Sequence, residues 1–284
     1  MLRKGGVAVA PPYPMVLFVA RVKSRTLKCP TMLTMAIWLA AISLEALLLF
    51  RGLQVRLVRR FPIFYFYILF VFADEILRFS VYRWDPKYYA QVYWPAQFLG
   101  LFIGSAVIFE IYRVALVRFP GTARMTRYVL LLVFGAVVAK ALTNSSDGLL
   151  SWLAGTSVEL ERNLRTVQAL AILTLVALFL WYAIPFGRNV KGILLGYGLF
   201  IATSLVQFAL WYYSIGNVQA FWPYAQPLSY ILVLAVWVGA LWSADPVLQI
   251  EPPRQLENDY QILAASTRNQ LQRALAFLGW AVRP

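Results

Sequence analysis

The sequence contains no histidine and only one cysteine, Cys29. Without histidine, the chain cannot bind haem, zinc or copper through imidazole, and it lacks the commonest general base. One cysteine excludes disulfide frameworks and thiolate metal clusters within the chain. The residues also show no nucleophile–base constellation and no set of metal ligands. We therefore expect no enzyme activity, no catalytic or metal site and no cofactor.

Charged residues are scarce as well. Only 13% of the 284 residues are charged and 61% are apolar, whereas soluble domains have about 25% charged and about 45–50% apolar residues. These proportions exclude a water-soluble globule. The net charge of +14 does not indicate nucleic acid binding, because the basic residues form short clusters between apolar runs. That distribution is typical of cytoplasmic loops, so we expect the lipid bilayer as the partner.

Seven apolar segments approach the length of about 20 residues that a spanning helix needs. They are Met32–Phe50, Phe61–Tyr82, Tyr93–Val114, Tyr128–Leu142, Val167–Ile184, Gly192–Tyr213 and Phe221–Trp242. The pattern predicts an all-α membrane protein with a seven-helix transmembrane domain over residues 32–243. Residues 1–31 are basic and proline-bearing, and their apolar patch is too short to span. We expect them to be a disordered tail or a mis-assigned start.

Residues 244–284 have a different pattern. Six apolar residues fall along one helical stripe: Leu256, Tyr260, Leu263, Leu271, Leu275 and Leu278. Arginines are interspersed, so the segment predicts a cytoplasmic amphipathic helix lying on the anionic inner leaflet. A short helix that forms a homo-oligomer or binds a membrane partner is the alternative.

The basic residues between the spans are unevenly divided between the two sides. One side holds Arg51, Arg56, Arg59, Arg60, Arg113, Arg118, Arg124, Arg127, Arg188, Lys191, Arg254, Arg268, Arg273 and Arg283. The other side holds Arg83, Lys87, Arg162 and Arg165. This bias predicts an external N-terminus and a cytoplasmic C-terminus, although the basic residues before Met32 argue for the reverse. We expect an integral protein of a bacterial plasma membrane.

An internal repeat is visible at an offset of 130 residues, which matches Leu69 with Leu199 and Phe70 with Phe200. The third predicted span also opens with Tyr93-Trp94-Pro95-Ala96-Gln97, and the seventh opens with Phe221-Trp222-Pro223-Tyr224-Ala225-Gln226. The repeat predicts two three-helix units of the same orientation joined by the fourth helix, a 3+1+3 plan known among transporters. Coincidence between two aromatic, proline-started helices is the alternative, because Trp and Tyr collect at membrane interfaces.

The 3+1+3 plan resembles that of sugar-facilitating SWEET proteins and that of microbial rhodopsins, in helix count and order only. A retinal protein needs a lysine in its seventh helix for the Schiff base, and Phe221–Trp242 contains none. SWEET proteins carry a proline–glutamine motif, which neither Pro95-Ala96-Gln97 nor Pro223-Tyr224-Ala225-Gln226 reproduces. The resemblance therefore implies a helix plan without membership of either family.

The strongest chemical signal is the charged group Asp74, Glu75 and Arg78 in the second span. Each such residue near a helix centre costs about 2.5–3.5 kcal/mol on insertion scales. Arg78 can pair with Asp74 at i,i+4 or with Glu75 at i,i+3. One cation cannot neutralise two carboxylates, so one acid needs another donor.

Other polar residues reach a similar depth in the neighbouring spans: Gln97, Thr203, Ser204, Gln207, Gln226 and Ser229. Together with the charged group they define a candidate ligand or ion pocket beneath an aromatic outer rim. The alternative is a structural polar network that holds the helices together. The loop Thr143–Arg165 is the longest predicted connection and would form a lid or a surface helix outside.

Glu45 and Glu110 lie near the ends of the first and third spans, each followed closely by an arginine, Arg51 and Arg113. We interpret them as ion pairs at the membrane interface, and a proton or ion gate is the alternative.

Three functions remain open on the sequence alone. The leading interpretation is a receptor-like or scaffold module with an externally facing pocket for a small polar ligand. The first alternative is a facilitator of a small solute or ion, which the repeat favours. The third is an intramembrane enzyme using Asp74 and Glu75, which lacks a supporting constellation.

Overall fold

A computed structural model describes residues 32–117, 119–143, 149–182, 187–212, 216–243 and 254–281. The predictions on residues 1–31, including Cys29, lie outside the described residues. Within the described ranges every regular element is a helix and no strand occurs. The long helices are α2 (Met32–Gln54), α3 (Pro62–Trp84), α4 (Tyr89–Ala115), α5 (Pro120–Leu142), α6 (Leu149–Trp181), α7 (Arg188–Tyr212), α8 (Gly216–Ala240) and α9 (Arg254–Ala281). The short 3₁₀ helices η1 (Leu57–Arg59) and η2 (Pro86–Tyr88) precede α3 and α4.

Local sequence explains several helix boundaries. α3 and α5 begin with Pro62 and Pro120, at a position where the missing N–H removes no helical hydrogen bond. Between α2 and η1 the chain turns at Arg56, whose φ of 58° is left-handed. A non-glycine residue seldom adopts that conformation, so this turn is locally strained.

Five helices have an apolar stretch long enough to cross a membrane. The stretches are Met35–Gln54, Tyr89–Ala115, Pro120–Leu142, Gly155–Trp181 and Arg188–Gln207. α3 is as long but carries Asp74, Glu75 and Arg78, and the apolar stretch found in α8, Pro227–Ala240, is shorter. An all-helical chain with several such helices fits an integral membrane protein, because a helix satisfies its own backbone polar groups in lipid.

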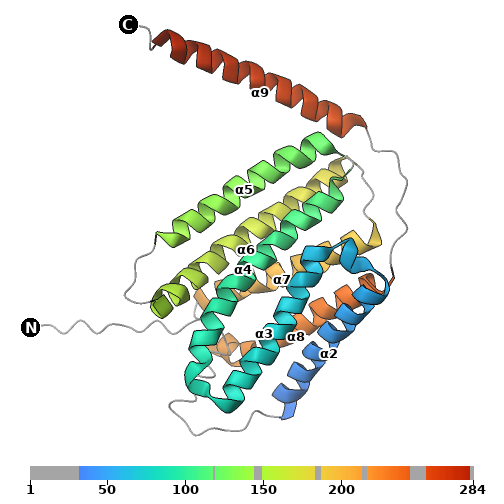
Figure 1. The fold of residues 1–284 in the computed structure, drawn as a ribbon, viewed down its shortest axis with the longest axis vertical. Helices are drawn as coiled ribbons and strands as arrows, with labels where there is room; N and C mark the ends of the chain where they lie inside the picture. Colours follow the sequence, from blue (N-terminus) through green and yellow to red (C-terminus); the bar gives the residue numbers. More distant parts are fainter. Residues whose placement is uncertain are drawn as a thin grey trace, which may run out of the picture.

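Six long helices form a closed ring in the order α2, α3, α4, α6, α7 and α8, with α8 again against α2. α5 lies outside this ring against α4 and α6 (Figure 1). α9 contacts α5 and runs away from the bundle, across the direction of α5 (Figure 1). The ring therefore encloses side chains from helices that are not adjacent along it.

An aromatic layer fills the centre of the ring, and it consists of Phe64, Tyr67, Tyr197 and Trp237. The ring centroids are 5.1 Å apart for Phe64 and Trp237, 6.4 Å for Tyr197 and Trp237, and 6.2 Å for Tyr67 and Tyr197. These contacts join α3 to α7 and α8, which are not its neighbours in the ring. None of the four residues is more than 6% exposed. The core of the bundle is therefore packed, at this level, with aromatic side chains.

Glycines allow the closest approach between α7 and α8. A Cβ atom built on Gly192 would lie 2.0 Å from the Cβ of Ala240, and one built on Gly196 would lie 2.4 Å from Nε1 of Trp237. Only residues without a side chain fit at these two points, as is usual where membrane helices pack closely.

The structure corrects two predicted boundaries. The loop predicted over Thr143–Arg165 and the span predicted from Val167 are wrong, because α6 already begins at Leu149. Arg162 and Arg165, which we had assigned to an external loop, therefore lie inside a helix. Arg165 is buried, pairs with Glu161 at i,i+4 and donates to Gln168, whereas Arg162 is exposed on the surface of the helix. The fourth helix likewise begins at Pro120 instead of Tyr128.

Candidate functional site

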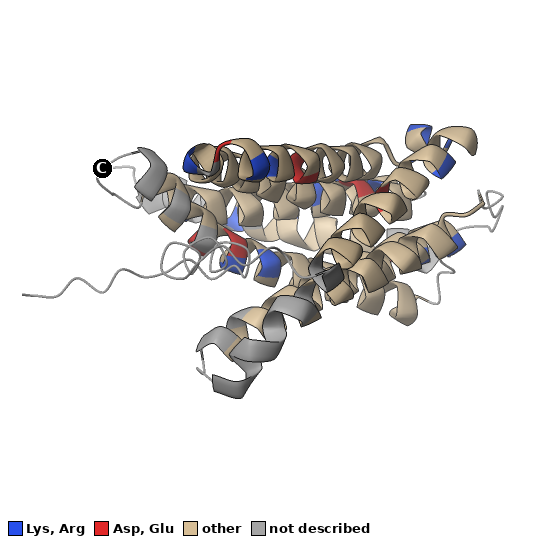
Figure 2. Ribbon diagram, turned by 90° about the horizontal axis from the view of Figure 1, so that it is seen from below, with Lys and Arg blue, Asp and Glu red and all other residues tan. Residues whose placement is uncertain are grey.

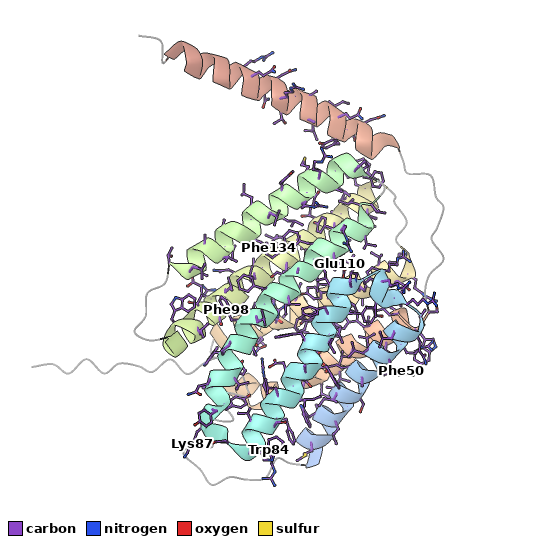
Figure 3. The ribbon with its side chains drawn as sticks, in the orientation of Figure 1. Phe50, Trp84, Lys87, Phe98, Glu110 and Phe134 are labelled. Carbon is purple, nitrogen blue, oxygen red and sulfur yellow. The ribbon has the colours of Figure 1, made fainter. Side chains whose placement is uncertain are left out.

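The two ends of the bundle can be told apart by their charged residues. α3 and α7 begin, and α2, α4 and α8 end, at one end, which we name the basic end for Arg51, Arg56, Arg59, Arg60, Arg113, Arg188 and Lys191. Glu110 and Phe50 lie toward this end, whereas Trp84 and Lys87 lie at the opposite one (Figure 3). Charged residues of both signs are few among the helices (Figure 2).

Asp74 and Arg78 form the ion pair that their spacing predicts. Nη2 of Arg78 lies 2.5 Å from Oδ2 of Asp74, and Nε donates a hydrogen bond to Oδ1 at 2.8 Å. The two side chains are only 17% and 11% exposed. The guanidinium also lies 4.5 Å from the ring centre of Tyr93 on α4, a cation–π contact. Arg78 is therefore committed to Asp74 and to an aromatic face.

Glu75 is the acid that this pairing leaves over. Its Oε2 is buried and has no hydrogen-bond partner among the described residues. Arg78 also acts on Glu75 electrostatically, and Glu75 in turn repels the carboxyl group of Glu45 on α2, which is 0% exposed. Oε1 of Glu45 accepts a hydrogen bond of 2.5 Å from the hydroxyl of Tyr230 on α8, while its Oε2 is also buried without a partner among the described residues.

The prediction of a Glu45–Arg51 ion pair is wrong. Arg51 donates to the side chain of Gln54 and to the carbonyl of Trp242, and its guanidinium stacks over the Trp242 ring at 4.3 Å. Glu45 lies two turns nearer the middle of α2 and faces α8. Its carboxyl group therefore lies inside the ring and not at its edge.

Glu110 has the contact with Arg113 that we expected, at 3.4 Å, but its main role is different. Its carboxylate accepts hydrogen bonds from the backbone N–H groups of Ile63 at 3.0 Å and Phe64 at 2.7 Å. These groups belong to the first turn of α3, which has no partner for them within the helix. Glu110 is therefore a capping residue supplied by a neighbouring helix.

A second polar network joins α4 and α6. Nη2 of Arg165 lies 3.6 Å from Oε1 of Glu161, and both side chains are at most 9% exposed. Gln97 donates to Oε2 of Glu161 at 3.1 Å, so this predicted site residue belongs to the second network. Arg165 also donates to Gln168, which in turn donates to the hydroxyl of Ser105 at 3.1 Å.

The two networks approach each other through aromatic side chains in the ring. The Arg165 guanidinium lies 4.4 Å from the ring centre of Phe200, and Phe200 is 6.1 Å from Tyr230, which bonds Glu45. Tyr67 interacts electrostatically with both Arg165 and Glu45. The interior of the ring is therefore a mixed polar and aromatic region.

The remaining predicted site residues lie on α7 and α8, and not on α3 with Asp74, Glu75 and Arg78. Ser204 is half-buried one turn beyond Phe200 and donates to the Phe200 carbonyl at 2.8 Å. Gln207 is 8% exposed, and Ser229 is half-buried immediately before Tyr230. The side chain of Gln226 lies outside the described residues. The structure thus joins Asp74 with Arg78 and leaves Gln97 with a partner, Glu161, that we had not considered.

Sequence reasoning missed Glu161, Arg165, Gln168 and Tyr230. A usable signal existed for the first three, because Glu161 and Arg165 are spaced i,i+4 and Gln168 follows on the same helical face. Their polarity instead led us to predict a loop. For Tyr230 there was no signal, since a tyrosine in an apolar helix does not show which carboxylate it will meet.

Among the described residues, no group of three or more Cys, Asp or Glu side chains is placed to hold a metal ion. Comparison with protein-family models, with curated proteins and with solved structures finds no match to this chain.

Proposed function

We propose that the chain is a seven-helix integral membrane protein that binds a small polar ligand inside its helical ring, as a receptor-like module without catalytic activity. One observation carries the proposal: charged side chains are buried within the ring beyond the aromatic layer. Asp74 and Arg78 lie about two and three turns beyond Tyr67 along α3. The aromatic layer separates them from the basic end, so the ligand would enter from the opposite end.

The energetics favour a binding role over a purely structural one. Ionisable residues inside a membrane are costly and usually serve a function. A polar network that only holds helices together is stable when each member is satisfied. Here one oxygen of Glu45, one oxygen of Glu75 and Nε of Arg165 are buried without partners among the described residues. These atoms could each contact a bound molecule.

The orientation is part of the proposal. We place the basic end in the cytoplasm of a bacterium, with the N-terminus outside, because basic loops are retained there. The position of α9 supports this arrangement: Tyr182, which follows α6 at the basic end, donates to Asp259 of α9 at 2.8 Å. An amphipathic helix held there would lie along the inner leaflet.

A facilitator is the second candidate, and the order of helices in the ring favours it. α2, α3 and α4 follow one another around the ring, and α6, α7 and α8 complete it in the same order, with α5 outside. Tyr67 and Tyr197, which the 130-residue offset matches, meet at the centre with their rings 6.2 Å apart. This arrangement supports a 3+1+3 plan, which transporters use to move two units against each other.

Thiol accessibility distinguishes the two candidates. In a Cys29→Ser background, Ser204→Cys would be exposed to a membrane-impermeant cationic methanethiosulfonate from either side of sealed vesicles. Labelling only from outside supports the receptor-like pocket, and labelling from both sides supports the facilitator. Labelling from neither side would show that the buried polar residues are structural. Val206→Cys is the matched control, because Val206 is 51% exposed on the outer surface of α7 and would face lipid.

A further inference from the structure

Glu45 and Glu75 are two neighbouring carboxylates without a cation of their own. The other charged group that acts on Glu45 is Asp74, which is also acidic. Glu75 is acted on by Arg78, but Arg78 makes both a 2.5 Å ion pair and a hydrogen bond with Asp74. The second buried arginine, Arg165, pairs with Glu161. The described residues therefore offer no further cation to these two carboxyl groups between α2 and α3.

The unpartnered oxygens show where compensation is missing. Glu45 is 0% exposed, and its Oε2 has no hydrogen-bond partner although Oε1 is held by Tyr230. Oε2 of Glu75 is buried and equally without a partner. A positively charged group between α2 and α3 would satisfy both oxygens at once.

We infer that Glu45 and Glu75 together bind one small monovalent cation, either an alkali-metal ion or a primary ammonium ion. An alkali-metal ion and a primary ammonium ion each present a compact positive charge to carboxylate oxygens. Tyr230 holds the Glu45 carboxylate in place. This site deepens the proposed function, because it names the charge of the ligand that the ring interior accepts.

Phe200 and Tyr230 add a reason for a cation at this place. Their rings lie 6.1 Å apart, and Phe200 already receives the guanidinium of Arg165 at 4.4 Å. Aromatic faces attract cations more strongly when water is excluded.

Thermal unfolding of the full chain in detergent tests the inference. The unfolding midpoint would be measured in sodium chloride, in methylammonium chloride and in N-methylglucamine chloride, whose bulky cation serves as the reference. We expect sodium, methylammonium or both to raise the midpoint of the unmodified chain. A cation at about ten times its dissociation constant lowers the fraction of folded protein with an empty site about tenfold. Binding to the folded state alone stabilises that state by mass action. A rise with sodium alone would identify the ligand as an alkali-metal ion, and a rise with methylammonium alone would identify it as a primary ammonium ion.

Variants link the effect to the two carboxylates. Glu45→Gln and Glu75→Gln keep the shape of each side chain and remove its charge, so the cation-dependent rise should disappear. Asp85→Asn is the matched control, because Asp85 is exposed beyond the end of α3 and should keep the full rise. An unmodified chain whose midpoint is the same in all three salts would overturn the inference. A rise that survives in Glu45→Gln or Glu75→Gln would also do so. Neither result changes the expected labelling of Ser204→Cys, so the proposed function is tested separately by that experiment.

Discussion

Glu110 of α4 caps α3 by accepting a hydrogen bond from the backbone N–H of Phe64 at 2.7 Å. The same carboxylate accepts from Ile63 at 3.0 Å, so two orphan donors of the first turn are satisfied. No side chain of α3 itself caps this end. A carboxylate at the start of a helix is further stabilised by the helix dipole.

Replacing Glu110 by Ala should therefore destabilise the protein through α3. Two backbone N–H groups would lose their acceptor, and the free energy of unfolding should fall by about 2 kcal/mol or more. Arg113→Ala is the control: Arg113 is 53% exposed and contacts the same carboxylate at 3.4 Å, so its loss should cost less than about 1 kcal/mol. Denaturant unfolding in detergent measures both. Equal effects of the two substitutions would show that the ion pair, and not the cap, matters.

The hydrophobic pattern predicted most of the fold because each apolar run corresponds to a helix in the ring or beside it. It failed at α6, whose first half contains Glu161 and Arg165. An isolated helix with these residues would be costly in lipid, so their polarity indicated a loop. Gln97 and Gln168, which come from α4 and from later in α6, remove that cost. Contacts of this kind depend on tertiary structure and leave no trace in a hydropathy profile.

The candidate site was predictable only where partners are close in sequence. Asp74 and Arg78 pair within one helix, and i,i+4 spacing identifies such pairs. Glu45 meets Tyr230 of the adjacent helix α8, 185 residues away, while Arg51 stands much closer in sequence but faces Trp242 instead. Sequence proximity favoured the wrong partner, because helix packing and not chain distance decides which side chains meet.

Breaking the Asp74–Arg78 pair should destabilise the protein more than removing the charges of Asp74, Glu75 and Arg78 together. Arg78→Leu leaves the carboxylates of Asp74 and Glu75 without a cation in the ring, and stranding a buried charge typically costs about 3–5 kcal/mol. A triple variant with Asp74, Glu75 and Arg78 replaced by apolar residues removes charge and desolvation cost together. We expect the single variant to be the less stable by denaturant unfolding. Equal stability would mean that these side chains are individually solvated.

The glycines of α7 offer a test of helix packing. Gly192→Ala would place a methyl group 2.0 Å from the Cβ of Ala240, which cannot fit unless α7 and α8 move apart. Overpacking of this kind costs about 1–3 kcal/mol. Gly135→Ala in α5 is the control, because a Cβ there would meet no atom within 4 Å. Alanine also favours a helix over glycine by about 1 kcal/mol, so Gly135→Ala should leave the melting temperature unchanged or raise it. A loss of stability in the control alone would contradict the packing of α7 against α8.

The topology can be decided with two engineered thiols in a Cys29→Ser background. Gly121 lies in the first turn of α5 at the basic end, and Asn217 lies in the first turn of α8 at the opposite end. Because basic residues are retained in the cytoplasm, Gly121→Cys should react with an impermeant maleimide only in inside-out vesicles or after permeabilisation. Asn217→Cys should react in intact cells. Reaction of both thiols from the same side would remove at least one crossing between α5 and α8, and with it the seven-span arrangement. Reaction of each from the side opposite to that expected would keep the spans but invert the protein, and the ligand site would then open toward the cytoplasm.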